Sequence, residues 1–376
     1  MGEERQRLLL IGAGHAHLHL LLHAERLTRA GYTITLVAPR WFDYSGGAVA
    51  AALDPAAHAS NRIDVAALAA RAGIEHVVGT VAALDPELRT AVSDDGTAVA
   101  WDIASLNIGS TAAPSAPLST PPAAPPSAGA IAVAIKPLDG LLRLREHLAA
   151  PPPPGGWTVE VVGAGASGIE LAAQLAARRE VGVVHLVEQA PQIAGDLPPG
   201  ARRWVERTLR RRGVVVHTGA GEERADLPPG GIISATPAHQ GCHVDVRVVA
   251  AGLVPVELAR RAPLGGPRGI PVRATLQHRD HDHVYAAGDC ADFLPRPLPK
   301  VGVHGVRQGP VLLEALLARA TEPTAGAPVY RPQERALAVI DLGDTGLAVR
   351  GRWWWAGRSA LLLKRSIDRR WLARYS

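Results

Sequence analysis

The sequence predicts an α/β protein built from two doubly wound parallel sheets, and three observations lead to this prediction. The chain has 376 residues, enough for two or three domains, and its apolar content of 47% is typical of a protein with a sizeable core. An apolar run, a glycine-rich turn and a helical pattern follow one another near residue 12 and again near residue 163. The two copies lie about 150 residues apart, which indicates an internal repeat at the scale of a domain.

Composition and segment length exclude several classes of protein. Two cysteines, Cys242 and Cys290, are too few for a disulfide scaffold, and no C-x-x-C or C-x4-C pair offers a dithiol redox centre. No apolar run reaches the roughly 18 residues that a membrane-spanning helix requires. The N-terminus shows no signal-peptide pattern, so we expect a cytoplasmic protein.

The first copy shows the elements of a parallel sheet in its first 110 residues. In chain order we expect a strand at 7–11, a helix from about 15 to 29, a strand at 32–37, a helix at 64–72, a strand at 74–78, and strands near 89–92 and 97–108. Residues 111–128 are rich in Pro, Ala and Ser without an apolar period, which predicts a linker or surface loop.

The second copy restarts the pattern after this loop. In chain order we expect a strand at 131–135, a helix at 138–149, a strand at 157–162, a helix at 168–179, a strand at 183–188, and strands near 213–217, 231–235 and 244–251. Residues 283–325 return to a strand, a Gly-Asp turn and a helix, and residues 326–376 form a basic, aromatic tail.

The second glycine-rich turn, Gly163-Ala-Gly165-Ala-Ser-Gly168, lies between a predicted strand and a predicted helix. In that context the first glycine allows a tight turn, the second lets a pyrophosphate approach the backbone, and the third lets helix and strand pack closely. The helix N-terminus then faces the phosphates. Glu188 ends the next strand, where a carboxylate bonds a ribose 2′-hydroxyl and repels a 2′-phosphate, so NADH is favoured over NADPH. The alternative is an ordinary glycine-rich turn.

The first glycine-rich turn, Gly12-Ala-Gly14-His15-Ala-His17, departs from this pattern in two ways. His17 stands where the third glycine would be, and the following strand ends at Ala38 instead of an acidic residue. Taken alone, the turn fits a nucleotide site and a plain Rossmann-like turn equally well.

A third motif follows the strand near residue 284. There Gly288 and Asp289 precede an apolar helix, an arrangement that resembles the second flavin motif of flavoproteins with two dinucleotide-binding domains. In those proteins the aspartate bonds the ribityl chain of FAD. The segments 105–110 and 248–252 each end a strand at a glycine and look like the two crossovers between the domains of such proteins.

Together these motifs resemble the FAD/NAD(P)-binding pyridine nucleotide-disulfide oxidoreductase superfamily, and within it the branch similar to type II NADH dehydrogenases. The chain looks most like the flavoprotein found fused or adjacent to selenide, water dikinase. That flavoprotein similarly has Gly-His-Ala-His in its first turn, the run Tyr44-Ser45-Gly46, the run at 105–110, a segment like 300–310, and a Trp- and Arg-rich terminus. The resemblance covers nearly the whole chain and is more specific for the fold and FAD than for the substrate.

The resemblance implies two Rossmann-like domains, the second inserted in the first, and a small C-terminal region. We expect an FAD-binding domain at 1–112 and 253–325, an NAD(P)H-binding domain at 113–252, and the basic, aromatic region at 326–376. The residues expected to contact the cofactors are Gly12, Gly14, His15, Ala38, Arg40, Ser45, Gly109, Gly163, Gly165, Gly168, Glu188, Gly252, Gly288, Asp289, Val301 and Gly302.

The chemistry that the resemblance implies is hydride transfer from the nicotinamide to N5 of the flavin, followed by electron transfer to a second acceptor. Glu170 lies in the first helical turn after Gly168, where related enzymes place a glutamate beside the nicotinamide. The alternative is a glutamate that only favours the helix N-terminus.

Lys300 is the second candidate catalytic residue. With His304, Arg307 and Gln308 it lies in the segment that borders the flavin edge and the quinone site in the family, and a cation there would stabilise an anionic reduced ring. The alternative is a set of solvated residues beside a helix start. The chain carries Gly302 and Arg307 where relatives carry Ala-Gln-x-x-x-Gln, so the geometry of a quinone site is open at this point.

Neither thiol chemistry nor a metal is expected. Sulfide:quinone oxidoreductases use separated catalytic cysteines, but Cys290 adjoins Asp289 and Cys242 stands alone, so thiol chemistry is the weaker alternative. Two histidine clusters, at 15–23 and 278–283, admit a metal as an alternative, and the first lacks a Cys or carboxylate ligand. We expect helix packing or phosphate contact for the first and a polar loop for the second.

The positive charge is concentrated in the tail. Residues 350–376 hold eight Arg or Lys and one Asp, a net charge of +7 in a chain whose total is +5, so the charge is no general nucleic-acid footprint. The same segment holds Trp353, Trp354, Trp355 and Trp371. Such a basic, aromatic segment suits an anionic membrane surface, and a helix docked on the body with buried tryptophans is the alternative.

We therefore expect an FAD-dependent oxidoreductase that passes a hydride from NADH to flavin and then electrons to a quinone-like acceptor. Two alternatives are a regulatory or scaffold protein that holds FAD and NADH but turns over slowly, and a reductase of a small soluble electron carrier. The expected partners are a small-molecule acceptor and, through the tail, the inner face of the cell membrane, with no nucleic acid. The sequence specifies neither the acceptor nor an oligomeric state.

Overall fold

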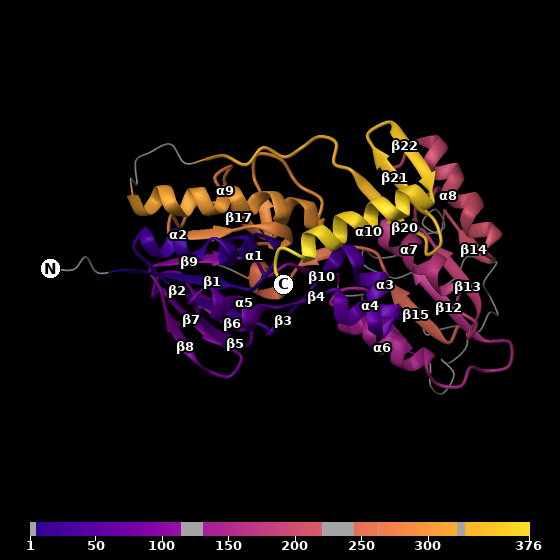
Figure 1. Cartoon of the computed structure of the whole chain (residues 1–376), viewed down its shortest axis with the longest axis horizontal. Helices are drawn as coiled ribbons and strands as arrows, with labels where there is room; N and C mark the ends of the chain where they lie inside the picture. Colours follow the sequence, from indigo (N-terminus) through magenta and orange to yellow (C-terminus); the bar gives the residue numbers. More distant parts are fainter. Residues whose placement is uncertain (1–4, 114–130, 220–243, 262, 322–327) are drawn as a thin grey trace, which may run out of the picture.

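Two five-stranded parallel sheets form the frame of the molecule, one in each half of Figure 1. The computed structural model describes residues 5–113, 131–219, 244–261, 263–321 and 328–376. The mixed α/β architecture with two Rossmann-like sheets that the sequence predicts is confirmed.

The first sheet has the spatial order β18–β9–β1–β2–β5, and all its strands are parallel. Its strands are β1 (Gln6–Ile11), β2 (Tyr32–Ala38), β5 (Glu75–Val78), β9 (Ile103–Leu106) and β18 (Val284–Ala286). Central β1 is apolar and buried from Leu8 to Ile11, because helices or loops cover both faces of the sheet. The helices of this half are α1 (His15–Leu22), α2 (Ala24–Arg29), α5 (Val65–Arg71) and α9 (Gly302–Thr321). Helices α1 and α9 pack against each other along this sheet.

The second sheet has the spatial order β11–β15–β12–β13–β14, again with all strands parallel. Its strands are β11 (Ile131–Ala134), β12 (Trp157–Val162), β13 (Val181–Val187), β14 (Val214–His217) and β15 (Val246–Val249). The helices packed against it are α6 (Asp139–Leu148), α7 (Ala166–Leu175) and α8 (Pro199–Arg211). Helices α3 (Ala48–Leu53) and α4 (Pro55–Ser60) follow β3 (Trp41–Asp43) in the chain, and α3 packs on α6 and α7.

Small antiparallel and parallel ladders connect and cover these sheets. They are the pair β3 (Trp41–Asp43) and β4 (Arg62–Asp64), the meander β6 (Val81–Asp85), β7 (Thr90–Ser93) and β8 (Ala98–Ala100), the pair β10 (Ser110–Ala112) and β16 (Leu253–Pro255), and the pair β17 (Ile270–Val272) and β19 (Ala291–Phe293). The β10–β16 pair is the place where the chain leaves the first half and returns to it.

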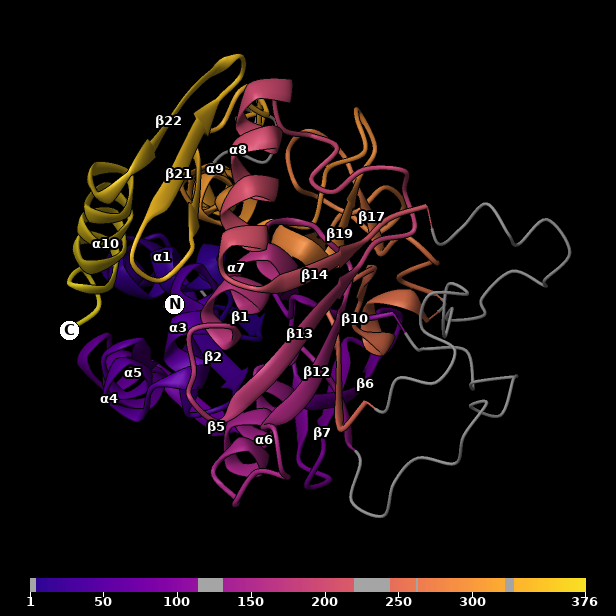
Figure 2. The same ribbon diagram turned by 90° about the vertical axis from the view of Figure 1, so that its right-hand side faces the viewer.

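The C-terminal region forms a three-stranded antiparallel sheet followed by a helix. Its elements are β20 (Ala338–Asp341), β21 (Gly346–Arg350), β22 (Trp353–Gly357) and α10 (Arg358–Leu372). Ile340 and Leu347 join the core of the second sheet, whereas Trp371 and Tyr375 join the core of the first. Helix α10, yellow in Figures 1 and 2, therefore connects the two halves of the molecule.

Some details differ from the sequence-based expectations, and one expected strand is not tested. The helix expected at 15–29 is divided into α1 and α2 at His23, whose φ of −118° and ψ of 20° lie outside the helical region. The strand expected at 97–108 is interrupted between β8 and β9 at the buried Trp101 and at Asp102. The strand expected near 231–235 lies outside the described residues.

Candidate functional site

A cavity of about 930 Å³ lies at the carboxyl edge of the first sheet, near the upper size limit of small-molecule sites. The turn Gly12–Gly14, the crossover Asn107–Ser110 and the turn with Gly288 and Asp289 all line it. Ligands bind at this edge of doubly wound sheets, where successive strands diverge. Gly109 borders the cavity with a φ of +77°, and no atom lies within 4 Å of the place where its Cβ would stand. The lining therefore leaves backbone open to a dinucleotide, as the predicted FAD site requires.

Asn107 holds the first glycine turn in place. Its Oδ1 accepts from the backbone N–H groups of Ala16 at 2.9 Å and His17 at 3.2 Å, and its Nδ2 donates to the Ala287 carbonyl at 2.6 Å. The side chain thus caps α1, whose first N–H groups have no partner within the helix, and ties α1 to the end of β18. Asn107 belongs to the sequence motif at 105–110, but the spacing of that motif does not predict that the side chain caps α1.

His17 explains how the first turn works without a third glycine. Its Nδ1 lies 2.6 Å from the Gly12 carbonyl oxygen and its Nε2 lies 2.8 Å from Ser105 Oγ. Because a carbonyl only accepts, Nδ1 carries the proton and Nε2 accepts from the serine hydroxyl. In the second turn a Cβ at Gly168 would stand 1.9 Å from the Gly163 carbonyl oxygen. In the second turn the Gly163 carbonyl thus leaves no room for a side chain at residue 168. In the first turn the equivalent Gly12 carbonyl accepts a hydrogen bond from the His17 imidazole.

Asp289 sits at the centre of a polar cluster inside the cavity. Its Oδ2 accepts from Ser110 Oγ at 2.7 Å and lies 3.0 Å from the Lys136 Nζ atom, and its side chain is 10% exposed. The backbone N–H of Gly288 donates to Gln308 Oε1 at 2.6 Å, which fixes the turn. Asp289 therefore lies in the cavity lining, and its contact with FAD stays a prediction. Lys136, from the segment between β11 and α6, is a cavity residue that the sequence reasoning missed.

The end of the cavity near β2 carries arginines as well as a carboxylate, Asp43, which pairs with Arg62 at 3.0 Å. Ala38 is fully buried and does not border the cavity, but Arg40 and Trp41 do. The guanidinium of Arg40 lies 5.1 Å from the Trp41 ring centre and 3.1 Å from Asp64, and Arg62 lies over the same ring at 4.7 Å. A cation–aromatic surface thus stands where many such sites have a ribose-binding carboxylate.

His15, Ser45 and Gly302 also line the cavity. The His15 ring packs against Phe42 at 5.1 Å and Trp371 at 5.0 Å between ring centres. Burial lowers the pKa of His15 to about 4, so its imidazole is neutral at pH 7. Of the other predicted contacts near the first sheet, Val301 and Gly252 do not border the cavity. Gly252 has a φ of +62° just before β16, and its carbonyl accepts from Ala113 N–H, so its role is in the crossover.

The second glycine turn repeats the geometry of the first. Gly163 N–H donates to the Val187 carbonyl at 2.8 Å, as Gly12 N–H does to Val37 in the first turn. The Glu188 carboxylate accepts from Ala164 N–H at 2.8 Å and from Ala190 N–H at 3.0 Å. Its oxygens are therefore held at the end of β13 beside the turn, and each retains a lone pair for a ribose hydroxyl.

The two predicted catalytic residues lie outside the cavity lining. Lys300 Nζ donates to the backbone carbonyls of Asp289 at 2.6 Å and Arg268 at 3.3 Å, so it supports the Gly-Asp turn from behind. Glu170 points from α7 toward β20, where its Oε1 accepts from Asp341 N–H at 2.7 Å. Burial raises the pKa of Glu170 to about 7, and the nearby ammonium of Lys364 acts against that rise.

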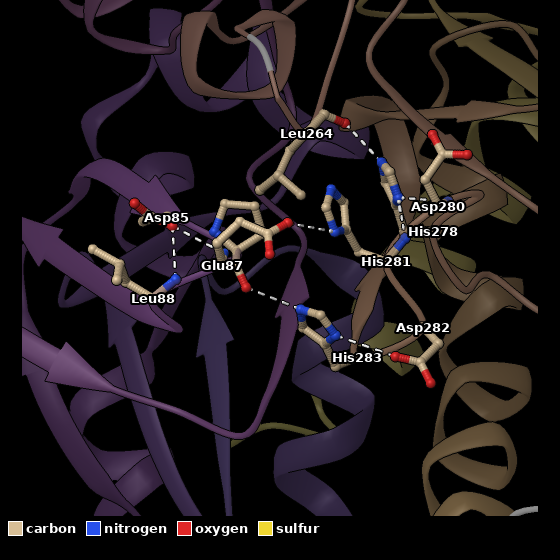
Figure 3. Close-up of polar contacts among 10 residues, drawn as sticks. Asp85, Glu87, Leu88, Leu264, His278, Asp280, His281, Asp282 and His283 are labelled. Carbon is tan, nitrogen blue, oxygen red and sulfur yellow. Dashed lines mark hydrogen bonds and ion pairs between the residues drawn. The ribbon is translucent and has the colours of Figure 1, made fainter.

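The histidines at 278–283 form polar contacts with neighbouring loops. Figure 3 shows the His278 ring directed to the Leu264 carbonyl and the His281 ring directed to Glu87. His281 lies 3.8 Å from the Glu87 carboxylate, and His283 Nε2 lies 3.1 Å from the Pro86 carbonyl oxygen. Among the described residues, no three His, Cys, Asp or Glu side chains are grouped so that they could hold a metal ion.

Of the two cysteines, Cys290 lies within the described residues and Cys242 does not. Cys290 is fully buried, its Sγ lies 3.2 Å from the Ala287 carbonyl oxygen, and burial raises its thiol pKa to about 11. A protonated, inaccessible thiol is a poor nucleophile. Cys242 lies outside the described residues.

The tail divides its aromatic residues between the body and the surface. Trp371 is 7% exposed and stacks on Tyr44, with 4.4 Å between ring centres and an angle of 21°. Trp353 is 83% exposed at the start of β22, and Leu362 on α10 is 63% exposed. Within the part of the chain that is described, no helix has the length and apolar character to cross a membrane.

Comparison with known proteins identifies relatives for this architecture. An NADH dehydrogenase-like protein of Mycobacterium tuberculosis is 32% identical over 245 residues, which cover 61% of this chain and 58% of the relative. A nitric oxide reductase FlRd-NAD(+) reductase of Escherichia coli is 33% identical over 143 residues, which cover 38% of this chain and 37% of the relative. The matches thus span less than two thirds of either relative.

Solved structures share the fold. The NDH2 of Plasmodium falciparum, in a complex with NADH, superimposes with a TM-score of 0.74 over 99% of this chain and 97% of its own, at 11% identity. The model of the family described as pyridine nucleotide-disulphide oxidoreductase matches residues 6–309, which exclude the whole C-terminal region at 326–376. Proteins of this family bind FAD and NAD(H), the two cofactors expected from the sequence. With the glycine turns, the Asp289 cluster and the family match in agreement, the chain belongs to the pyridine nucleotide-disulphide oxidoreductase family.

Proposed function

We propose that this protein is an FAD-dependent oxidoreductase that takes a hydride from NADH and passes the electrons to a quinone-like acceptor. The observation that carries the proposal is the cavity at the carboxyl edge of the first sheet, with Asp289, Ser110 and Lys136 gathered in it. The second glycine turn, with Glu188 at its side, supplies a separate nucleotide cradle. When bound, FAD supplies the redox chemistry, because its ring accepts a hydride and releases electrons to an acceptor.

The residues of the chain bind and orient the cofactors in this proposal. Gly12, Gly14 and the start of α1 would hold the pyrophosphate of FAD, and Asp289 would accept hydrogen bonds from its ribityl hydroxyls. Neutral His15 and the ammonium of Lys136 border the remaining part of the cavity. Glu188 would accept a hydrogen bond from the ribose of NADH, which would favour NADH over NADPH.

An anaerobic titration with NADH tests the proposal. The purified protein is expected to be yellow, and NADH is expected to bleach its flavin absorbance at one equivalent per FAD. Asp289→Asn should weaken flavin retention, whereas Asp292→Asn, three positions further along the chain and outside the cavity lining, should not. A wild-type protein that stays colourless after incubation with FAD would contradict the proposal, and bound flavin that NADH reduces without transfer to any acceptor would favour a scaffold role.

In the second half-reaction of this proposal, electrons pass from the flavin to the acceptor without a protein thiol. The buried thiol of Cys290 argues against a cysteine in electron transfer. A quinone needs no protein thiol, because it takes electrons directly from a reduced flavin. The similarity to an NADH dehydrogenase-like protein supports the same choice. The closeness to flavoproteins associated with selenide, water dikinase stays a prediction.

A reductase of a small soluble electron carrier is the second candidate. One relative is a FlRd-NAD(+) reductase, and Arg203, Arg207 and Arg210 form an exposed basic row on α8 that could dock an acidic carrier. Steady-state rates with a water-soluble quinone and with rubredoxin, across salt concentrations, separate the two functions. Turnover with rubredoxin alone, falling steeply with salt, would replace the quinone in this proposal.

Contact of the tail with an anionic membrane would bring the protein to a membrane quinone. Exposed Trp353 and Leu362 beside arginines such as Arg352 support this contact, whereas Trp371 is not available for it. Sedimentation with phosphatidylglycerol vesicles should retain wild type at low salt and lose Trp353→Ala with Arg352→Gln. Leu88→Ala, an exposed apolar side chain in the turn between β6 and β7, is the matched control. Wild type that stays in the supernatant at low salt would remove the membrane from the proposal.

A further inference from the structure

Three segments of the first half meet at one point of the cavity wall. His15 begins α1, Ser45 begins the short 3₁₀ helix Ser45–Gly47, and Gly302 begins α9, and all three residues line the cavity. A Cβ on Gly302 would stand 3.1 Å from His15 Cε1 and 3.2 Å from Ser45 Oγ. The imidazole and the hydroxyl therefore converge on the start of α9, and the shape of the wall depends on what holds them there.

The His15 ring packs on aromatic rings, one of which comes from the C-terminal helix. Its centre lies 5.1 Å from that of Phe42, 5.9 Å from that of Tyr44 and 5.0 Å from that of Trp371. Trp371 is only 7% exposed, and its indole nitrogen is buried without a hydrogen-bond partner among the described residues. Trp371 therefore supports the wall through the packing of its ring, and not through a hydrogen bond.

A charged pair on α10 holds the turn that carries Ser45. Lys364 is 8% exposed, and a lysine is rarely buried so deeply unless its ammonium is paired. Its Nζ donates to the Gly46 carbonyl and lies 3.1 Å from Asp368 Oδ2. The other oxygen of Asp368 accepts from the Tyr44 hydroxyl at 3.0 Å. The residues on both sides of Ser45 are thus bonded to α10.

The three contacting residues of α10 share one face of the helix. Lys364, Asp368 and Trp371 follow one another at intervals of four and three residues, which places their side chains in one row. Arg369 and Arg370 lie between them in the chain and are exposed. One face of α10 therefore holds two of the three segments that meet in the cavity wall, and the arginines on other faces take no part in this contact.

We infer that α10 is a clamp on the flavin cavity, by which we mean that its buried face holds the cavity wall in place and that retention of the cofactor depends on this hold. Lys364, Asp368 and Trp371 are the positioning residues. The inference rests on the proposed function in one respect, because it takes FAD to be the occupant of the cavity. The whole of α10 lies beyond residues 6–309, so a segment outside the family model completes the cofactor site.

The first experiment measures how fast FAD leaves the loaded protein, from the rise of free-flavin fluorescence after dilution. Lys364→Met and Trp371→Ala should each release FAD about tenfold faster than wild type or more, the scale of one lost hydrogen bond to a charged group. Lys364→Arg keeps the ammonium's charge and donors and should restore slow release. Trp371→Phe keeps an aromatic ring and should also stay near wild type, because the indole N–H that it removes has no partner.

Two controls separate the clamp from a general loss of stability. Arg370→Met removes a cation from an exposed position of the same helix and should leave the release rate unchanged. Leu27→Ala removes a fully buried side chain of α2 from the same core as Trp371, away from the cavity lining. It should lower the midpoint of urea unfolding without a comparable effect on flavin release.

The second experiment needs no cofactor. The Cε1 proton of His15, assigned by its loss in His15→Gln, gives an NMR signal that the Trp371 ring shifts at the observed spacing of 5.0 Å. Lys364 is not a cavity-lining residue, so movement of this signal in Lys364→Met reports that the hold of α10 on His15 has changed. Leu27→Ala should leave the signal in place. If Lys364→Met does not fold, Asp368→Asn replaces it in both experiments.

The outcomes that overturn the inference differ from those that overturn the proposed function. Release from Lys364→Met and Trp371→Ala no faster than from Leu27→Ala, or a His15 signal that Lys364→Met does not move, would overturn the clamp. Release from Trp371→Phe as fast as from Trp371→Ala would overturn the positioning role of the ring. A wild type that binds no FAD would overturn the proposed function, and the NMR signal would still report on the hold of α10.

Discussion

Protonation of His17 should destabilise the first sheet, because both ring nitrogens are committed in the neutral form. Nδ1 donates to the Gly12 carbonyl and Nε2 accepts from Ser105, so a second proton on Nε2 would face a hydroxyl that is donating to it. Burial lowers the pKa of His17 to about 4 from 6.5. The unfolded chain therefore binds this proton first as the pH falls, and stability is lost between pH 6.5 and 4. The full loss is about 3 kcal/mol, of which about 2 kcal/mol is lost by pH 5.

The perturbation that isolates this effect is His17→Asn. The amide nitrogen of asparagine occupies the place of Nδ1 and can still donate to Gly12, but it does not titrate. At pH 7.5 the variant should be less stable than wild type by about 1–3 kcal/mol, because Ser105 loses its acceptor. Wild type should then lose about 2 kcal/mol of that advantage between pH 7.5 and pH 5.

Urea unfolding followed by tryptophan fluorescence, at matched cofactor content and at several pH values, measures the difference. Leu20→Ala, a fully buried position on the same helix, is the control: it should cost about 2–5 kcal/mol without a comparable dependence on pH. A difference between wild type and His17→Asn that is the same at pH 5 and pH 7.5 would refute the reasoning.

The remaining predictions concern the site itself. Asn107→Ala removes an acceptor for two backbone N–H groups and a donor to Ala287, so calorimetry should show a loss of about 2–3 kcal/mol in the free energy of unfolding, and flavin should dissociate faster. Asn107→Asp keeps the acceptor, so its stability should lie between those of Asn107→Ala and wild type. An Asn107→Ala variant as stable as wild type would contradict the role of Asn107 as a helix cap. Glu188→Gln should reduce the preference for NADH over NADPH, measured from the ratio of their kcat/KM values, by about 1–3 kcal/mol. Equal kcat/KM values for NADH and NADPH in wild type would contradict the assignment. Cys290→Ser with Cys242→Ser should keep most NADH:acceptor activity, whereas a loss of several hundredfold with flavin still bound would indicate sulfide-type chemistry.

The sequence predicted those parts of the site whose residues lie close together in the chain. The two glycine turns and the Gly288-Asp289 turn each combine a strand, a turn and a helix within about 20 residues, so their geometry follows from local backbone constraints. Lys136 could not be found in this way, because its approach to Asp289 depends on how the second sheet is set against the first. Asn107 was visible in its motif, but its partners lie at residues 16 and 287.

The tail was the hardest region for the same reason. Three consecutive tryptophans, Trp353 to Trp355, have no helical or strand period, so their place in a β-hairpin was not predictable. Trp371 is buried, as the alternative of a docked helix expects, whereas Trp353 is exposed. Contact of the tail with a membrane stays a prediction. The hydrogen bond from Asp341 N–H to Glu170 likewise joins residues that are far apart in the chain, and it became visible only in the folded molecule.

The position of β18 in the first sheet has a consequence for synthesis on the ribosome. Its partner β9 ends at Leu106, but β18 starts only at Val284, after every strand of the second sheet has been made. The second sheet can therefore pair its strands while β9 still presents a bare hydrogen-bonding edge, a known route to wrong pairing between chains. A nascent chain halted near residue 260 would carry one complete sheet and one open sheet, and the order of folding would be the reverse of the order of translation.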